Sequence, residues 1–221
     1  MDTLGIKSKD YVKKYGEVFT PDSIVNDMLD LVDNAMKEEN ISPEEYLAKT
    51  YLEPSCGDGQ FLIRILDRKL ACIAKHVAKE DQELAVVKAV STIYGVDIQN
   101  VNVEMSKRRM MTLLKTGSVN TFDLPNKEIR SFTKIDLNWT PELERVIQYI
   151  LDKNIVYGDT LCKDDSKVVQ IIEFSWRGRG VLQTLYYLNH LDIPNGSTDY
   201  MDYTLLGSSE EIEDDFDQDN F

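Results

Sequence analysis

The sequence predicts an α/β protein with a doubly wound, mostly parallel sheet, and two patterns support this prediction. Short apolar stretches of strand character recur at residues 51–53, 92–97, 154–157 and 168–174. Segments with apolar residues at helical spacing lie between them, at 61–70, 83–91, 101–115 and 141–153. Strands that alternate with helices are typical of parallel sheets. With 42% apolar residues in 221, the chain can bury a substantial core in one domain.

The N-terminal helix of this domain is predicted to begin at Thr20-Pro21. Threonine is a favoured N-cap residue, and proline is favoured at the first helical position. Apolar residues then recur at helical spacing up to Met36. We expect residues 11–50 to form an N-terminal helical region of a domain that spans residues 1–195.

The charge distribution separates this domain from a tail at residues 196–221. The net charge is −14, and no Lys or Arg follows Arg179, whereas ten acidic residues do. Residues 1–179 therefore hold 29 acids against 25 bases. Because affinity for nucleic acid comes largely from Lys and Arg on phosphates, the composition does not itself indicate DNA binding. We expect the acidic tail to be disordered and solvated.

Composition also limits the compartment and the cofactor chemistry. No apolar run approaches the roughly 20 residues of a membrane helix, and the N-terminus lacks the pattern of a secretory signal. Three scattered cysteines and two separated histidines indicate neither a disulfide framework nor a metal site. We therefore expect a cytoplasmic protein without a metal.

The strongest local signal is the glycine-containing turn after the first predicted strand, Glu53-Pro54-Ser55-Cys56-Gly57-Asp58-Gly59-Gln60-Phe61. In open α/β sheets, ligands bind outside the carboxyl ends of the strands. Gly57 and Gly59 carry no side chain, so the backbone can approach a ligand closely. The amides that begin the next helix favour an anionic group. An ordinary tight turn is the alternative explanation.

Acidic residues end the next two predicted strands, and both suit a nucleoside. Asp97 ends the second strand, where a carboxylate accepts hydrogen bonds from ribose hydroxyls. Asp159 ends the third strand, where it could accept a hydrogen bond from an adenine amino group. A helix cap at Asp97 and a turn at Asp159 are the structural alternatives.

These motifs together resemble the N6-adenine DNA methyltransferases of restriction–modification systems. The segment Lys14-Tyr15-Gly16-Glu17-Val18-Phe19-Thr20-Pro21 looks like their motif X, and Leu52 to Phe61 looks like motif I. Tyr94-Gly95-Val96-Asp97-Ile98 resembles motif II, and Gly158-Asp159-Thr160-Leu161 resembles motif III. The resemblance covers about residues 11–175. It implies a Rossmann-like class I fold and S-adenosylmethionine (SAM) as cofactor.

The resemblance also assigns roles to individual residues. Phe19, Thr20 and Pro21 would close over the methionine end of SAM. Glu53, Gly57 and Gly59, in the turn that includes Pro54 and Phe61, would hold its amino-acid part. Asp97 would bind the ribose with Ile98 beside the adenine. Asp159, in the turn that ends at Leu161, would accept the adenine amino group.

The family's catalytic motif, Asn/Asp/Ser-Pro-Pro-aromatic, is absent, because the chain contains no Pro-Pro. In the family this motif polarises the target amine and stacks on a flipped base. Its expected place holds Phe174 to Arg179, where Ser175 and Trp176 are the weak candidates. Trp176 could stack on a base, although packing at the end of the sheet is the commoner role of such a ring. About 45 residues follow, so we expect the sheet to be truncated in its C-terminal half.

Three functions remain open at this stage. The first is a DNA adenine methyltransferase with a divergent catalytic loop. The second is an inactive, SAM-binding subunit or decoy of a restriction–modification or phage-defence system. In that case a protein partner or a second copy of the chain would complete the fold. The third is an acidic interaction protein whose tail imitates nucleic-acid phosphates. For the first two, a bacterial or phage-infected cell is the expected setting.

Overall fold

A computed structural model describes residues 20–120, 129–162 and 168–208 of the chain. It begins with two helices, α2 (Asp22–Glu38) and α3 (Pro43–Ala48). Three strands then alternate with longer helices: β1 (Tyr51–Glu53), α4 (Gln60–His76), α5 (Gln82–Ser91), β2 (Ile93–Asp97), α6 (Asn100–Thr116), α7 (Pro141–Asn154) and β5 (Ile155–Tyr157). A short pair, β3 (Ser118–Asn120) and β4 (Ile129–Ser131), lies between α6 and α7. The last elements are β6 (Gln170–Arg177), β7 (Gly180–Tyr187), β8 (His190–Ser197) and β9 (Met201–Asp202).

The first three predicted strands form a parallel sheet in the order β1-β2-β5. Leu52 lies beside Tyr94, and Asp97 lies beside Tyr157, so the three carboxyl ends meet at one edge. These three predicted strands and the four helices between and around them are confirmed with small changes of boundary. The coarse prediction of an α/β protein with a parallel sheet is therefore correct.

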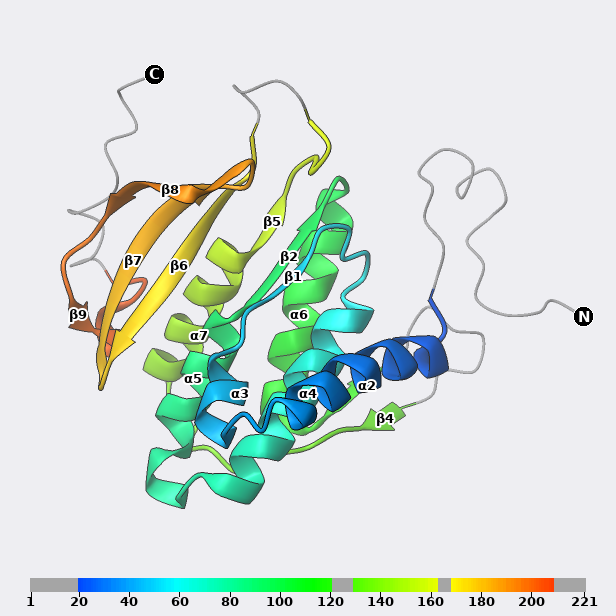
Figure 1. The fold of residues 1–221 in the computed structure, drawn as a ribbon. Coiled ribbons are helices and arrows are strands. Elements are labelled where there is room, and N and C mark those ends of the chain that lie inside the picture. The colour runs from blue at the N-terminus through cyan, green and yellow to red at the C-terminus, as the bar shows by residue number, and fades with distance from the viewer. Residues whose placement is uncertain (1–19, 121–128, 163–167, 209–221) are drawn as a thin grey trace, which may run out of the picture.

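Helices cover one face of this parallel sheet, and an antiparallel sheet covers part of the other. A Cβ on Gly95 would meet Leu62 of α4 at 2.8 Å, so α4 lies directly against that face. On the opposite face, Tyr94 and Val96 pack with Val169 and Ile171 at the start of the antiparallel sheet. Figure 1 shows α4 and α6 to the right of the parallel sheet and β6, β7 and β8 to its left.

The fourth predicted strand does not join the parallel sheet, and this part of the prediction is wrong. β6 pairs antiparallel with β7 along its whole length. Only 12 residues separate β5 from β6, and the described ones contain no helix. Parallel strands are usually joined by a crossover that contains a helix. The chain instead reverses and runs back across the sheet.

The hairpin between β6 and β7 explains why the strand continues past residue 174. Arg177 pairs with Gly180, which leaves a two-residue loop. Gly178 has φ +59°, and Arg179 is not among the residues with positive φ, as in a type II′ turn. Such turns match the twist of the flanking strands, so β6 is an arm of a hairpin rather than a crossover strand.

Two predicted boundaries also change. α2 begins at Asp22 with Pro21 as its N-cap, so Thr20 is not the N-cap. Arg64 of α4 holds Asp22 in the first turn at 2.8 Å. Beyond residue 196, β9 pairs with β7, and Tyr203 and Leu206 are buried. The packed domain therefore extends past the predicted start of the tail, and residues 209–221 lie outside the described ones.

Candidate cofactor site at the carboxyl edge of the parallel sheet

The turns that follow β1, β2 and β5 are tied together at the carboxyl edge. Cys56 N–H donates to Val96 O at 2.8 Å, which holds the first turn against β2. Gly158 N–H donates to Asp97 O at 3.0 Å. The hydroxyl of Thr160 donates to Pro54 O at 3.2 Å. The structure therefore brings together three segments that are about 40 to 100 residues apart in the sequence.

Gly57 and Gly59 give the first turn its shape, for different reasons. Both have positive φ, +54° and +87°, in a region that other residues rarely adopt. A Cβ on Gly59 would lie 2.7 Å from the Ser106 hydroxyl, so α6 leaves no room for it. A Cβ on Gly57 would meet nothing within 4 Å. The peptide at Gly57 is thus the part of the turn with open space beside it.

Asp97 organises this turn rather than pointing freely out of the sheet. Its Oδ2 accepts the Gly57 N–H at 2.9 Å, and its Oδ1 accepts the Gln99 N–H at 2.8 Å and the Asn102 amide at 3.2 Å. The residue is buried. Three donors from the chain occupy most of its lone pairs, so a ribose hydroxyl could use only the remaining position on Oδ2. Asp97 is not a cap of α6, because the N-cap is Gln99 and no side chain of the described residues caps this helix. Its carboxylate instead holds the turn at Gly57 and leaves one position for a ligand.

Glu53 lies where β1 enters the turn and is half-buried. Burial raises the pKa of its carboxyl above the ordinary value, and the hydrogen bond from Ser55 N–H opposes that rise. A partly desolvated carboxylate favours a cationic partner, because an opposite charge nearby stabilises the ionised form. Glu53 is therefore suited to the ammonium group of an amino acid.

Apolar side chains surround the same edge and remain exposed. Ile98 is 55% exposed and Leu161 is 85% exposed, and the exposed set also includes Val101 and Tyr157. Large apolar side chains exposed together at one edge favour the binding of a flat, apolar part of a ligand. Phe61, by contrast, packs against the core from the first turn of α4.

Asp159 begins the turn after β5 and is exposed. Its Oδ1 accepts the Leu161 N–H at 2.9 Å, which is the turn-forming role considered for it. Thr20 and Pro21 lead into α2, whose first turn is tied to Arg64 of α4, and Pro21 is exposed. Phe19 lies outside the described residues.

Ser175 and Trp176, the weak catalytic candidates, lie at the opposite end of the parallel sheet, where Trp176 has the packing role that was the alternative to catalysis. The Trp176 indole N–H donates to the Ser91 hydroxyl at 3.0 Å, and Ser91 precedes the amino end of β2. Four rises of about 3.3 Å separate Ile93 from Asp97, so at least about 13 Å lies between this contact and the carboxyl edge. The reversal of β6 is the cause, because it carries the end of the strand away from that edge.

Sequence reasoning missed a polar stripe on α6 that supports the turn. Asn102, Ser106 and Arg109 follow helical spacing and face the turn from behind. The Ser106 hydroxyl donates to Gly57 O at 3.0 Å. The Arg109 guanidinium donates to Asp58 O at 2.7 Å and to Gln60 Oε1 at 3.0 Å. The only signal was three polar residues at i, i+4 and i+7 in a helix whose other buried positions are mostly apolar.

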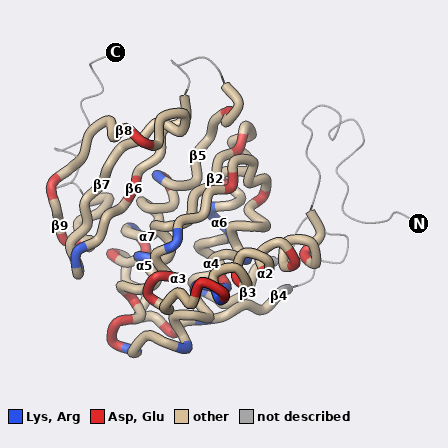
Figure 2. The backbone as a smooth tube through the Cα atoms, viewed as in Figure 1, with Lys and Arg blue, Asp and Glu red and all other residues tan. Residues whose placement is uncertain are grey.

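The ionisable groups at this edge limit which ligands it can bind and which reactions it can carry out. Within the described residues, no group of three or more His, Cys, Asp or Glu side chains could hold a metal ion. Burial raises the pKa of the Cys56 thiol to about 12, so this cysteine is not a thiolate nucleophile. Figure 2 shows acidic residues at the sheet edge and along α2 and α3, and those of α2 include Asp22 and Asp33, which pair with arginines of α4. This edge is therefore suited to a cationic or neutral ligand rather than to DNA phosphates.

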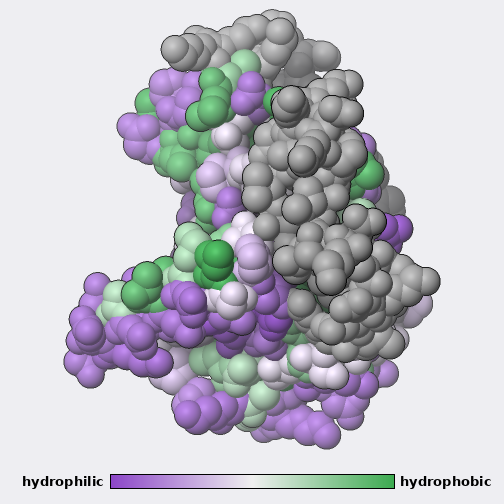
Figure 3. All heavy atoms as spheres, turned by 90° about the vertical axis from the view of Figure 1, so that its right-hand side faces the viewer, coloured by the Kyte–Doolittle hydropathy of each residue, from purple (hydrophilic) through white to green (hydrophobic). Residues whose placement is uncertain are grey.

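The space-filling view shows an indentation in the outline of one face of the molecule. In Figure 3, a projection stands out below this indentation. The projection is hydrophilic below, and hydrophobic residues appear along its upper side. α2 carries exposed apolar side chains, including Ile24, Met28 and Leu31.

Comparison of the chain with protein-family models, curated proteins and solved structures found no match. In the described parts of the chain, no helix is both long and apolar enough to cross a membrane. The geometry itself therefore carries the functional argument.

Proposed function

We propose that this chain binds SAM at the carboxyl edge of its parallel sheet and acts as a SAM-binding, methyltransferase-like subunit. The observation that carries the proposal is the Gly57 peptide, which has a positive φ, faces open space and is fixed by Asp97 and Ser106. A glycine in this position allows a ligand to approach the backbone, as the turn after the first strand of a nucleotide-binding sheet requires. The Rossmann-like class I fold is part of the same proposal.

The residues at this edge match the parts of SAM. Glu53 would bind the ammonium group, and the amides at the start of α4 would face the carboxylate. The free position on Asp97 would accept a ribose hydroxyl. Ile98 and Leu161 would lie against the adenine, with Asp159 near its amino group. Thr20 and Pro21 would lie toward the methionine end.

Methyl transfer by the chain alone is not part of this proposal. Ser175 and Trp176, the candidates from the sequence, are at the other end of the sheet. Transfer to DNA adenine, the activity of the family that the motifs resemble, would need acceptor groups beside the cofactor, which Ser175 and Trp176 do not supply. The proposed role is therefore a binding subunit or decoy in a restriction–modification or phage-defence system, in the cytoplasm of a bacterial or phage-infected cell.

Calorimetric titration with SAM tests the binding proposal, with two glycines as a matched pair. Gly57 and Gly178 have nearly equal φ, +54° and +59°, and an added Cβ would meet nothing at either position. Both substitutions put a Cβ at a positive φ, so Gly57→Ala and Gly178→Ala should both lose stability, by about 1 kcal/mol or more. Only Gly57→Ala should weaken SAM binding, by about 30-fold or more, because its methyl group occupies the proposed ligand space.

Two outcomes of this titration would contradict the proposal. One is wild-type protein that does not bind SAM. The other is an equal loss of affinity in both variants, which would indicate a general effect of backbone strain. A parallel assay with radiolabelled SAM and unmethylated DNA should show no transfer by the chain alone, and transfer would show that a catalytic group had been overlooked.

A further inference from the structure

The turn proposed to hold SAM is supported from behind by α6, through side chains that do not reach the ligand space. Asn102 donates to Asp97, and Asp97 accepts the Gly57 N–H. Ser106 donates to the carbonyl of the same Gly57. The Gly57 peptide is therefore held through its N–H and its C=O at once, and both contacts lead back to α6.

Arg109 extends this support to the two residues that flank Gly59. Its guanidinium pairs with the Asp58 carboxylate at 2.5 Å and donates to the Asp58 carbonyl at 2.7 Å. It also donates to the Gln60 side chain at 3.0 Å. Gly59 itself lies against Ser106, one turn earlier on α6. One side chain thus fixes the last residues of the turn and the first residue of α4.

The side chain of Arg109 is largely buried and held by several contacts. Its side chain is only 13% exposed, and that of Asp58 is 22% exposed. A guanidinium presents several donors in a rigid plane, so it can bind a carboxylate, a carbonyl and an amide oxygen simultaneously. A lysine at this place could keep the charge pair but could not reproduce all three contacts.

We propose that Arg109, with Ser106, is a positioning residue for the cofactor, which sets the conformation of the Gly57–Gln60 turn before SAM binds. This inference rests on the proposed function, because the ligand it serves is SAM. A turn that is ordered in the free protein lowers the conformational cost of binding. Loss of Arg109 should therefore weaken SAM binding although Arg109 does not touch SAM.

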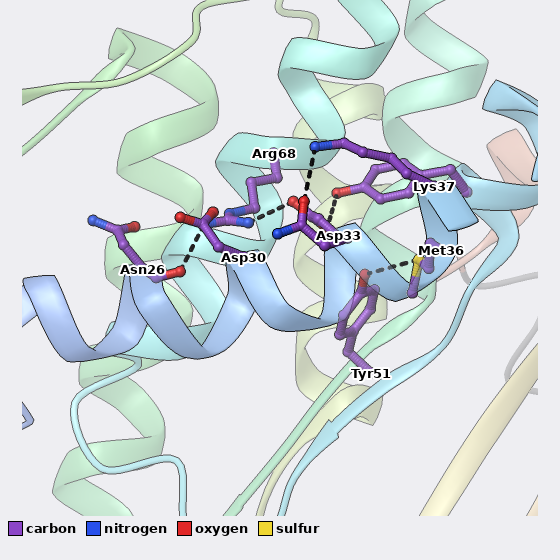
Figure 4. Close-up of polar contacts among 9 residues, drawn as sticks. Asn26, Asp30, Asp33, Met36, Lys37, Tyr51 and Arg68 are labelled. Carbon is purple, nitrogen blue, oxygen red and sulfur yellow. Dashed lines mark hydrogen bonds and ion pairs between the residues drawn. The ribbon is translucent and has the colours of Figure 1, made fainter. Parts of the chain in front are cut away.

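The chain offers a matched control on α4. Arg68 binds Asp30 and Asp33 of α2 and donates to Asn26 O, as Figure 4 shows. Its side chain is 20% exposed, close to the value for Arg109. Arg68 joins α4 to α2, whereas Arg109 joins α6 to the glycine turn. The contacts of Arg68 therefore do not involve the glycine turn. Arg68→Met should lower the thermal midpoint without changing the affinity for SAM.

Two measurements on Arg109→Met, Arg109→Lys and Arg68→Met test the inference. Hydrogen–deuterium exchange on the ligand-free proteins should show faster exchange of the amides at 57–61 in the Arg109 variants only. Calorimetry with SAM should show affinity that falls at least about tenfold in Arg109→Met, falls less in Arg109→Lys and is unchanged in Arg68→Met. If Arg109→Met does not fold, the same two measurements on Arg109→Lys and Ser106→Ala test the inference.

The results separate this inference from the proposed function. If wild-type protein does not bind SAM, the proposed function is wrong and the inference falls with it. If wild-type protein binds SAM but Arg109→Met binds it within twofold of wild type, only the positioning role is overturned. Unchanged exchange at 57–61 in the Arg109 variants would also overturn that role, whatever the SAM titration shows.

Discussion

The two ends of the parallel sheet differ in how their polar groups are satisfied. At the amino end, Asn154 donates to Ser91 O and Ile93 O, and Trp176 donates to the Ser91 hydroxyl. Lys69 donates to Leu47 O at 2.7 Å and Lys49 O at 2.8 Å, just before β1. The chain itself thus closes this end with side chains from α4, α7 and β6.

At the carboxyl end, the polar contacts fix a turn but leave its outer side open. Asp97 and Arg109 hold the backbone from within, whereas Gly57 faces open space and Ile98 and Leu161 are exposed. The difference between the two ends shows that the order of the strands does not by itself determine where a ligand can bind. The end of the sheet that the reversed β6 closes carries the tryptophan, and the other end carries the features that suit a ligand.

The largest expected effect that would sharpen this comparison is at Asp97. In Asp97→Asn, the side-chain oxygen can still accept one backbone N–H. The NH2 group replaces the other oxygen and cannot accept a hydrogen bond, so the contact with either Gly57 N–H or Gln99 N–H is lost. We expect a loss of about 1–3 kcal/mol of stability and a loss of SAM affinity of about tenfold or more. Chemical denaturation and calorimetry would measure the two effects.

Asp202→Asn is the matched control for Asp97→Asn. Asp202 also accepts a backbone N–H, that of Thr204 at 3.1 Å, and pairs with Arg179 near the β6–β7 hairpin. It should lose stability but bind SAM as wild type does. Equal losses of SAM affinity in both variants would mean that the two ends are not functionally distinct.

Lys69 predicts a pH dependence of stability for the closed end. Burial lowers the pKa of its ammonium to about 7, whereas an unfolded lysine keeps a pKa near 10.5. The unfolded state therefore binds more protons between these values, and stability should rise with pH from about 7 to about 10. The slope from this group is at most about 1.4 kcal/mol per pH unit.

Urea denaturation of wild type and Lys69→Met across this pH range measures the slope. The wild-type curve should rise more steeply than that of Lys69→Met, and the two should run parallel below pH 7. Lys37→Met, an exposed position on α2, should follow wild type. Parallel curves for wild type and Lys69→Met above pH 7 would show that Lys69 stays charged in the folded state.

The smallest expected effect is at Trp176. Trp176→Phe keeps an aromatic ring in the closed end but removes the donor to Ser91, so stability should fall by about 1 kcal/mol. SAM affinity should not change. A clear fall in SAM affinity in this variant would indicate that Trp176 contributes to SAM binding. The two ends of the sheet would then not differ in function as proposed.

Local patterns were sufficient to predict the three parallel strands, the helices between them and the glycine turn. They did not predict the direction of β6, because residues 170–177 read as a strand in either direction. The partner of a strand depends on the length of its connection and on distant surfaces such as those of Tyr94 and Val96. The one local signal for the hairpin was Gly178 between two arginines.

The supporting role of α6 was hidden for a related reason. Arg109 lies in the basic run Lys107-Arg108-Arg109, which looks like a solvated helix face. Lys107 instead pairs with Asp152 of α7, while Arg109 faces the glycine turn. Only the fold shows that adjacent cations on one helix serve different neighbours. Likewise, the donors that occupy Asp97 come from residues 57, 99 and 102, and the first of these is distant in sequence.

Hydrogen–deuterium exchange of the wild-type chain with and without SAM tests the central claim most directly, because one experiment reads both ends of the sheet. Binding at the carboxyl edge predicts slower exchange with SAM at residues 53–61, 97–102 and 157–162, and no change at 174–182. Protection at 174–182, or no protection at residues 53–61, would contradict a cofactor site at the glycine turn.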